Sequence, residues 1–331
     1  MRSKQGAAKI AKEESSYVKL IAGTSVPELA KEISKNVGIP LVKADIGKFS
    51  NGETRVEILE SVRGADVFVI QSTCPPVNDN VMELLLMMDA LRRASANSIN
   101  LMVPYFGYAK QDKKKTGREP ISAKVMADMM ENAGAERLVT VDLHAQQIEG
   151  FFDIPVDNLS AIYAFAEHFK SRKMDNIVVV TPDAGGTKRA RNLANAMQAE
   201  RIAIIDKYRP DWRKADAMNV IGKVEGMNAI IVDDFIDTAG SMVEAVKAVR
   251  NHKAEKLWVA CTHPLLTDPA TERLKALEDA GEVEGFVFTD TVPIPTHKML
   301  KSYEIISTAP MLADTIERIA RGFSLHPYKS K

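Results

Sequence analysis

The stretch that most restricts the fold of this chain covers residues 228–241, where an apolar segment leads into acids and then into small residues. Residues 229–232 are apolar and rich in β-branched side chains, as in a parallel strand covered on both faces. From Ser241 to Arg250 the apolar residues recur at helical spacing. A buried strand that turns directly into a helix is typical of an open parallel sheet, so we expect an α/β protein.

The turn between these two elements is suited to an anion. It is the run Asp237, Thr238, Ala239, Gly240 and Ser241, which offers backbone N–H groups with little side-chain bulk around them. The hydroxyls of Thr238 and Ser241 lie at a helix N-terminus, which favours an anion. Asp233 and Asp234 repel phosphate, but they accept hydrogen bonds from a vicinal diol or from water on Mg²⁺. No cationic partner for them is evident in the local sequence. A ribose 5-phosphate fits both halves; the simpler interpretation is that the acids cap the following helix.

Apolar strand segments alternate with helical segments along almost the whole chain, which is the order of an α/β protein. The expected strands are 17–22, 67–71, 99–104, 138–143, 177–180, 202–205, 229–232, 257–261, 286–288 and 304–306. The expected helices are 26–36, 80–94, 122–132 with Ser122 as N-cap and Gly134 as stop, 160–172, 186–197, 241–251, 269–280 and 310–321.

The length predicts more than one domain, because 331 residues exceed what a single core usually supports. We expect two similar α/β domains, each a mostly parallel sheet flanked by helices, at 17–159 and 160–309. Residues 1–16 are expected to form a disordered extension. The helix at 310–322 is expected to pack back on the first domain.

Composition favours a cytoplasmic enzyme. Charges balance at 44 basic and 44 acidic residues, which gives no support for nucleic-acid or membrane binding. No apolar run approaches the roughly 18 residues of a membrane span. Residues 1–16 lack the apolar core of a signal peptide, and the acids Glu13 and Glu14 argue against a transit peptide. Cys74 and Cys261 have no metal-type spacing and are expected to be reduced and buried.

Other polar residues also follow predicted strands. His144 follows 138–143, Asp183 follows 177–180, and Lys207 and Arg209 follow 202–205. In an open parallel sheet these positions emerge at one edge. Taken singly, a histidine is more often structural and a basic pair is more often solvated. Their joint occurrence beside the turn at 237–241 favours a common site.

Several motifs resemble those of known families. The stretch at 232–241 resembles the phosphoribosyl-diphosphate motif of type I phosphoribosyltransferases. From Val18 to Arg321 the chain resembles the ribose-phosphate pyrophosphokinases in the order and spacing of Phe49-Ser-Asn-Gly-Glu53, Pro104-Tyr-Phe-Gly-Tyr-Ala-Lys-Gln-Asp112, Arg118-Glu-Pro-Ile-Ser-Ala-Lys124, Asp142-Leu-His144, Gly150-Phe-Phe-Asp-Ile-Pro155, Pro182-Asp-Ala-Gly-Gly186 and Val232-Asp-Asp-Phe-Ile-Asp-Thr-Ala-Gly240. The resemblance implies a duplicated phosphoribosyltransferase fold, ATP, Mg²⁺, and conversion of ATP and ribose 5-phosphate to 5-phosphoribosyl 1-diphosphate and AMP.

The resemblance also implies a role for each motif. Ribose hydroxyls would bind Asp233 and Asp234, and the 5-phosphate would bind residues 237–241. ATP would lie on Phe49, Asn51, Glu53, Lys110 and Gln111. The metal on the ATP phosphates would be held by His144 and Asp183. Lys207 and Arg209, in a polar stretch expected to be a closing loop, would stabilise the transition state. The family places the Phe49 segment across a subunit interface, which implies a dimer-built hexamer.

Five positions depart from the family pattern. Lys110 replaces the usual Arg and lacks its planar guanidinium. Ser241 replaces Thr and keeps the hydroxyl. Glu149 stands where regulated members have Gln beside a regulatory anion site, and His326-Pro327 replaces the usual Ser-Tyr.

Two alternative functions stay open at this point. A phosphoribosyltransferase that consumes the diphosphate has no need of the motifs at Phe49 and Lys110. A silent regulatory subunit would be expected to lose the metal ligands or the basic pair, and His144, Asp183, Lys207 and Arg209 are all present.

Overall fold

The computed structural model describes residues 17–199, 201–208, 217–325 and 328. The chain forms two compact units, one built from the residues up to Leu159 together with those from Ala309, and the other from Ser160–Thr308. Residues 1–16, Arg209, His326 and Pro327, for which the sequence raised expectations, lie outside the described residues. None of the helices in the described ranges is both long and apolar enough to span a membrane.

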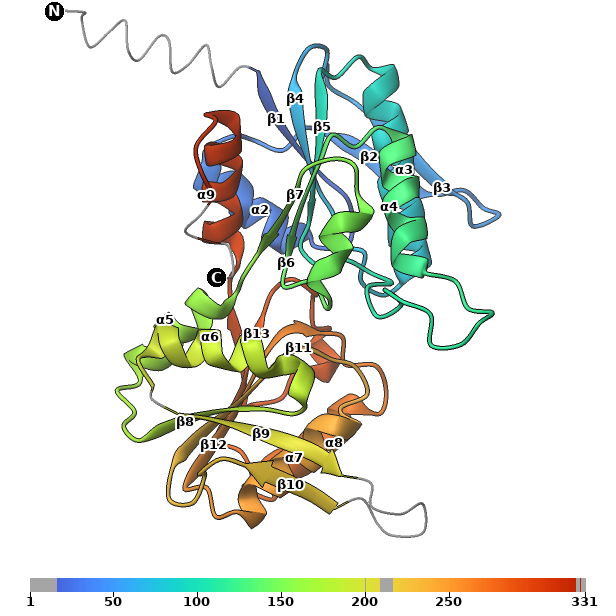
Figure 1. The fold of residues 1–331 in the computed structure, drawn as a ribbon. Helices are drawn as coiled ribbons and strands as arrows, with labels where there is room; N and C mark the ends of the chain where they lie inside the picture. Colours follow the sequence, from blue (N-terminus) through green and yellow to red (C-terminus); the bar gives the residue numbers. More distant parts are fainter. Residues whose placement is uncertain (1–16, 200, 209–216, 326–327, 329–331) are drawn as a thin grey trace, which may run out of the picture. The chain divides into compact units, whose positions relative to one another are not determined.

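The first unit is built on a five-stranded parallel sheet with the order β1-β4-β5-β6-β7. The strands are β1 (Val18–Ala22), β4 (Asp66–Ile70), β5 (Ser98–Val103), β6 (Arg137–Val141) and β7 (Val156–Leu159). The helices α3 (Val77–Arg93) and α4 (Ser122–Ala133) cover one face, and α2 (Pro27–Val37) and α9 (Ala309–Ala320) cover the other (Figure 1). A 3₁₀ helix, η1 (Gln146–Phe151), precedes β7. An antiparallel pair, β2 (Ala44–Lys48) and β3 (Thr54–Ile58), forms a separate hairpin.

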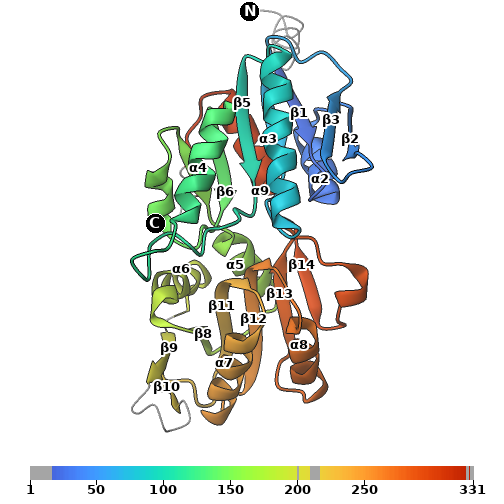
Figure 2. The same ribbon diagram turned by 90° about the vertical axis from the view of Figure 1, so that its right-hand side faces the viewer.

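The second unit is built on a seven-stranded sheet with the order β10-β9-β8-β11-β12-β13-β14. Its strands are β8 (Ile177–Thr181), β9 (Arg201–Tyr208), β10 (Ala217–Ile221), β11 (Asn228–Ile236), β12 (Lys256–Pro264), β13 (Gly285–Thr289) and β14 (Tyr303–Ile306). All neighbours are parallel except β9 and β10. The helices α5 (Ile162–Ser171) and α6 (Thr187–Met197) lie on one face, and α7 (Gly240–Asn251) and α8 (Ala270–Asp279) on the other (Figure 2). The short 3₁₀ helices are η2 (Ala184–Gly186) and η3 (Thr296–Lys298).

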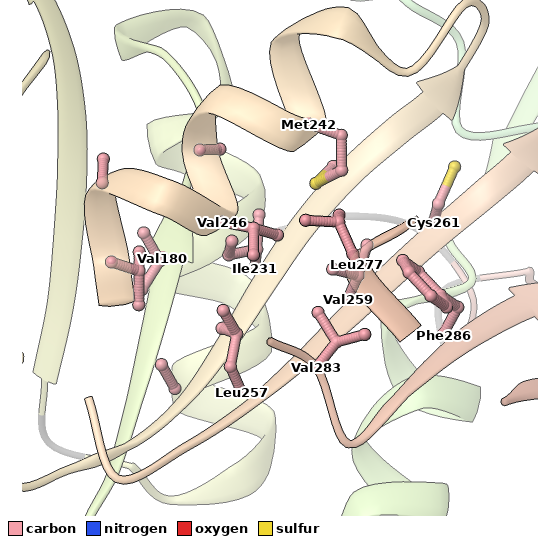
Figure 3. Close-up of a cluster of buried hydrophobic side chains, with 14 of the residues drawn as sticks. Val180, Ile231, Met242, Val246, Leu257, Val259, Cys261, Leu277, Val283 and Phe286 are labelled. Atoms are coloured by element: carbon pink, nitrogen blue, oxygen red, sulfur yellow. The ribbon is translucent and has the colours of Figure 1, made fainter. Parts of the chain in front are cut away.

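The core of the second unit lies between its sheet and the helices α7 and α8. Met242 and Val246 of α7 face Ile231 and Val259 of the strands, and all four side chains are buried (Figure 3). Burial of one such side chain contributes about 1.5–3 kcal/mol. The unpaired Cys261 lies in the same layer, as expected for a reduced, buried cysteine. This packing fixes the carboxyl end of β11 and the start of α7.

The α/β order predicted from the sequence is confirmed, and so is Gly134, which ends α4 in the left-handed conformation. Four strands were not predicted: β2, β3, β7 and β10. Ser122 is not an N-cap, because that position is occupied by Ile121 and the Ser122 hydroxyl donates a hydrogen bond to Gln111 instead.

Several strands are longer than predicted, and in β11 and β9 this changes the setting of the candidate residues. The strand β11 continues to Ile236, so Asp233 and Asp234 lie inside it and not after it, with Asp233 opposite Cys261 of β12. The strand β9 continues to Tyr208, so Lys207 belongs to a strand where a loop was expected. The prediction ended both strands at the last apolar residue, whereas pairing with neighbouring strands continues through the polar ones.

Candidate functional site

The turn after β11 leads directly into the N-terminus of α7. Ala239 adopts a left-handed conformation with φ of +61°, and α7 begins at Gly240. Arg273 of α8 donates a hydrogen bond to the carbonyl of Thr238 at 2.8 Å, which supports the turn from outside. The first N–H groups of a helix have no partner within the helix, and they carry partial positive charge. The turn is therefore suited to an anion, as its sequence predicted.

The acid pair precedes this turn. The Asp234 side chain is 5% exposed and that of Asp233 is 24% exposed. Their cationic partner is Arg189 of α6, which lies 44 residues before Asp233 in the sequence. Its Nη1 is 3.3 Å from Oδ1 of Asp233, and its Nη2 is 3.4 Å from Oδ2 of Asp234. Sequence reasoning missed this residue, because nothing local to the acid pair indicates where α6 packs.

Burial and charge act against each other at this pair. Burial, and then the charge of Asp234, hold the pKa of Asp233 well above its usual range, while the Arg189 guanidinium opposes this rise. Burial and the two carboxylates also raise the pKa of the Cys261 thiol. Two carboxylates and one guanidinium leave one net negative charge when all are ionised. Such a group accepts hydrogen bonds from sugar hydroxyls at a lower cost in repulsion than two unpaired acids.

The loop after β8 opens on the same sheet edge, because β8 pairs with β11 in parallel. Asp183 is exposed, and its Oδ1 accepts the N–H of Gly186 at 3.1 Å. A Cβ on Gly186 would lie 2.2 Å from Oγ1 of Thr181, so the turn requires glycine at this position. The turn thus presents an oriented carboxylate beside the acid pair of the same unit.

The strand β9 lies on the other side of β8. The last residue of β8, Thr181, pairs with Ile204 of β9. Lys207 lies further along β9, where it pairs with Met218 of β10. The backbone of Lys207 therefore extends past the edge on which β8 ends. Arg209, the other member of the basic pair, lies outside the described residues.

In the first unit, the motif at Phe49 forms the turn of the β2–β3 hairpin. Phe49 is 52% exposed, and the Asn51 side chain accepts the N–H of Glu53 at 3.2 Å. Gly52 has φ of +91°, a conformation that favours glycine. Asn-Gly between short alternating segments is a hairpin signal, and it could have predicted β2 and β3.

Lys110 and Gln111 lie on the long loop between β5 and α4. The Gln111 carbonyl accepts the N–H of Ala123 at 3.2 Å, which ties the loop to the first turn of α4. Lys110 is half-buried and has interactions of its own. These contacts hold the loop in a defined position.

His144 lies on the loop after β6. The preceding Asp142 has φ of +41° and donates its N–H to the carbonyl of Leu159 at 2.8 Å. Glu149, in the following η1, accepts a hydrogen bond from the Asn158 amide at 3.2 Å. An ion pair with Lys114 or Arg118 would neutralise the Glu149 carboxylate, and no such pair occurs among the described residues.

The two candidate metal ligands belong to different units, His144 to the first and Asp183 to the second. Within the described ranges, no three His, Cys, Asp or Glu side chains gather as a self-sufficient metal site. Mg²⁺ is commonly held by one or two protein ligands together with substrate phosphates and water, so a sparse protein site is compatible with it.

A parallel sheet whose carboxyl edge joins an acid pair to a small-residue turn at a helix N-terminus is typical of α/β proteins that bind phosphorylated ligands. Family models extend this class to both halves of the chain. Residues 18–134 match the N-terminal domain of ribose phosphate pyrophosphokinase, and residues 209–328 match the phosphoribosyl synthetase-associated domain. The chain belongs to the ribose-phosphate pyrophosphokinase family.

Individual relatives agree with this assignment over nearly the full chain. A ribose-phosphate pyrophosphokinase of Oceanobacillus iheyensis is 47% identical over 92% of this chain and 94% of its own length. One of Bacillus subtilis is 46% identical over 91% of this chain and 94% of its own. The crystal structure of phosphoribosylpyrophosphate synthetase from Mycobacterium smegmatis is similar with a TM-score of 0.86 and 39% identity, over 92% of this chain and 99% of that one.

Proposed function

We propose that this protein is an enzyme that transfers the diphosphoryl group of ATP to the 1-hydroxyl of ribose 5-phosphate. The products are 5-phosphoribosyl 1-diphosphate and AMP. The observation that carries this proposal is the acid pair and anion-binding turn of β11 and α7, in a chain 46–48% identical to ribose-phosphate pyrophosphokinases. These relatives favour the synthase over the two alternatives, a phosphoribosyltransferase and a silent subunit.

Ribose 5-phosphate is assigned to the second unit. Its 5-phosphate accepts hydrogen bonds from the turn at 237–241, which has backbone N–H groups and the hydroxyls of Thr238 and Ser241 next to the positive end of α7. Its ring hydroxyls donate to Asp233 and Asp234, which are carboxylate acceptors at the end of β11. Ser241 keeps the hydroxyl that the family has as Thr, so this departure is expected to leave phosphate binding intact.

ATP is assigned to three segments. The exposed ring of Phe49 stacks on adenine, Asn51 and Glu53 contact the polar edge of the base, and Lys110 and Gln111 bind beside it. Lys110 supplies a single point charge where relatives offer a guanidinium, so stacking and bidentate phosphate contacts are lost at this position. We expect nucleotide affinity to be lower than in members with arginine.

The reaction moves a diphosphoryl group between two oxygens. The 1-hydroxyl oxygen attacks the β-phosphorus of ATP, the bond from that phosphorus to the α–β bridging oxygen breaks, AMP leaves, and the hydroxyl proton is released. Negative charge is spread over the transferred group in the transition state, where cations stabilise it most. We assign this role to Lys207 and Arg209, because Lys207 lies at the carboxyl end of β9, next to β8.

Mg²⁺ is the proposed cofactor, and His144 and Asp183 are the residues that would hold it. The exposed, oriented carboxylate of Asp183 is the kind of hard oxygen donor that this ion prefers. When bound, the ion neutralises phosphate charge and polarises the phosphoryl group. The neutral imidazole of His144 is a less usual donor for this ion than a carboxylate.

Self-association completes the proposal. Phe49 extends half-exposed from a hairpin that stands outside the main sheet of its unit, as suits a residue that reaches into a partner subunit. We propose at least a dimer and, by family resemblance, a dimer-built hexamer. A cytoplasmic location agrees with the two unpaired, buried cysteines, Cys74 and Cys261.

The test is AMP formation from ATP in the presence and absence of ribose 5-phosphate. A synthase forms AMP only with ribose 5-phosphate and makes 5-phosphoribosyl 1-diphosphate in equal amount. A phosphoribosyltransferase would instead consume that diphosphate with a base, and a silent subunit would form no AMP. The Lys207→Ala variant is the control, because it removes the proposed transition-state cation and should abolish most of the AMP signal.

A further inference from the structure

The residue Arg189 has no role in the assignments above, yet it lies at the centre of the sugar site. It belongs to the first turns of α6, its side chain is 17% exposed, and it reaches two carboxylates with two different nitrogens. Nη1 lies 3.3 Å from Asp233 and Nη2 lies 3.4 Å from Asp234. The planar fork of a guanidinium can bridge two carboxylates in this way, whereas an ammonium cannot hold both in one plane.

The position of Arg189 follows from the turn that precedes it. Thr181 ends β8, Asp183 accepts the N–H of Gly186, and α6 starts at Thr187, so α6 rises directly from the sheet edge. Arg189 lies directly beside this turn, since a Cβ built on Gly186 would be at ordinary contact distance, 3.7 Å, from its Nη1. The same turn therefore presents Asp183 and sets the approach of Arg189 to the acid pair.

The acid pair needs this cation because its carboxylates are adjacent and largely buried. Burial and the charge of Asp234 already raise the pKa of Asp233, and Arg189 opposes this rise. Without Arg189 the repulsion between the two carboxylates is uncompensated, which favours retention of a proton by one of them. A protonated carboxyl donates a hydrogen bond where a sugar hydroxyl needs an acceptor. The vicinal diol of a ribose presents two hydroxyls, so an acid pair that loses one acceptor binds it less well.

We infer that Arg189 is a positioning residue for the sugar substrate: it holds Asp233 and Asp234 side by side as two acceptors for the ribose diol. The inference rests on the proposed function, since it concerns the same sugar site. Arg189 does not need to touch the sugar itself. Its effect is expected on ribose 5-phosphate and not on ATP.

The test compares three variants by calorimetric titration of each ligand separately. Arg189→Met removes the charge and keeps most of the volume, and Arg189→Lys keeps the charge without the fork. Arg191→Met is the matched control, because Arg191 is exposed on the same helix. We expect Arg189→Met to weaken ribose 5-phosphate binding by about tenfold or more and ATP binding by less than about twofold. Arg189→Lys should be intermediate, and Arg191→Met should match the wild type.

The outcomes separate the inference from the proposed function. If the wild type does not bind ribose 5-phosphate, the proposed function fails first. If the wild type binds it and Arg189→Met binds it equally well, only the inference is overturned. Equal losses for both ligands would mean a general structural role and would also overturn it. If Arg189→Met does not fold, Arg189→Lys decides: a selective loss of ribose 5-phosphate affinity supports the bridge, and wild-type affinity overturns it.

Discussion

The two units place a parallel strand, a turn and a long helix in matching positions of their sheets, and they use them differently. In the first unit, β4 leads through residues 71–76 into α3 and lies beside β1. In the second, β11 leads through residues 237–239 into α7 and lies beside β8. Each unit also has an antiparallel pair earlier in its sequence, β2–β3 in one and β9–β10 in the other. The side chains at the ends of β4 and β11 differ, and this difference decides which strand end is suited to bind a ligand.

At the end of β4, the polar groups satisfy one another. Glu83 accepts hydrogen bonds from the N–H of Thr24 at 2.6 Å and from the Gln71 amide at 2.8 Å. The other end of that amide accepts the N–H of Ser25 at 3.0 Å. The helix that follows begins after a Pro-Pro pair, which offers no N–H at those positions.

At the end of β11, by contrast, the polar groups form a charged cluster beside a helix N-terminus. Asp233 and Asp234 lie beside Arg189, and α7 starts at Gly240, directly after the left-handed Ala239. The same strand–turn–helix arrangement thus stabilises the fold in the first unit and forms a candidate binding site in the second. Function follows from the side chains at the strand end and not from the fold.

The largest effect expected in this comparison lies on the basic pair of the second unit. Lys207→Ala and Arg209→Ala should each lower kcat by on the order of 10² or more, since each removes a donor that acts in the transition state. KM for both substrates should change much less. Steady-state kinetics decide the matter: a raised KM with intact turnover would mean that the residue binds the ground state.

The first unit offers the matched structural change. Glu83→Ala should lower the free energy of unfolding by about 2 kcal/mol, because it removes the acceptor of the Thr24 N–H and the nearer of the two acceptors of the buried Gln71 amide. Ribose 5-phosphate affinity of the folded variant should equal that of the wild type. Denaturant unfolding and calorimetry measure the two quantities. A folded variant with weakened sugar binding would break the distinction between the two strand ends.

Substitutions in the acid pair of the second unit, unlike Glu83→Ala in the first, should weaken sugar binding. Asp233→Asn and Asp234→Asn should each weaken ribose 5-phosphate binding by about tenfold, since a charged acceptor for a sugar hydroxyl is lost. ATP affinity should stay nearly unchanged. Calorimetric titration of both ligands is the measurement, and a matched loss for the two would point to a shared metal site or a distorted turn.

The smallest expected effect concerns regulation in the first unit. Glu149 accepts a hydrogen bond from a neutral amide, Asn158, and no cation pairs with it among the described residues. A carboxylate about 4–6 Å from a bound anion repels it by about 1 kcal/mol in a solvated site, which is several-fold in affinity. We therefore expect weaker phosphate activation and weaker ADP inhibition than in members with Gln, partly restored by Glu149→Gln. Titrations of activity with phosphate and with ADP test this, and superimposable curves for the two proteins would refute the repulsion.

The sequence by itself determined the α/β class, most strand and helix positions and the candidate turn. These depend on local signals: the apolar period distinguishes strands from helices, and small residues after a buried strand mark the turn. The hairpin β2–β3 was also within reach, because Asn51-Gly52 is a local hairpin signal.

Only the tertiary structure decided how these parts act on each other. It extended β11 through Asp233 and Asp234, because pairing with β12 and not side-chain polarity sets the length of a strand. It brought Arg189 to the acid pair from 44 residues away, because the packing of α6 on the sheet determines which helix residue faces β11. Local patterns carry no information on such distant partners, since the energy of an ion pair depends on separation in space and not along the chain.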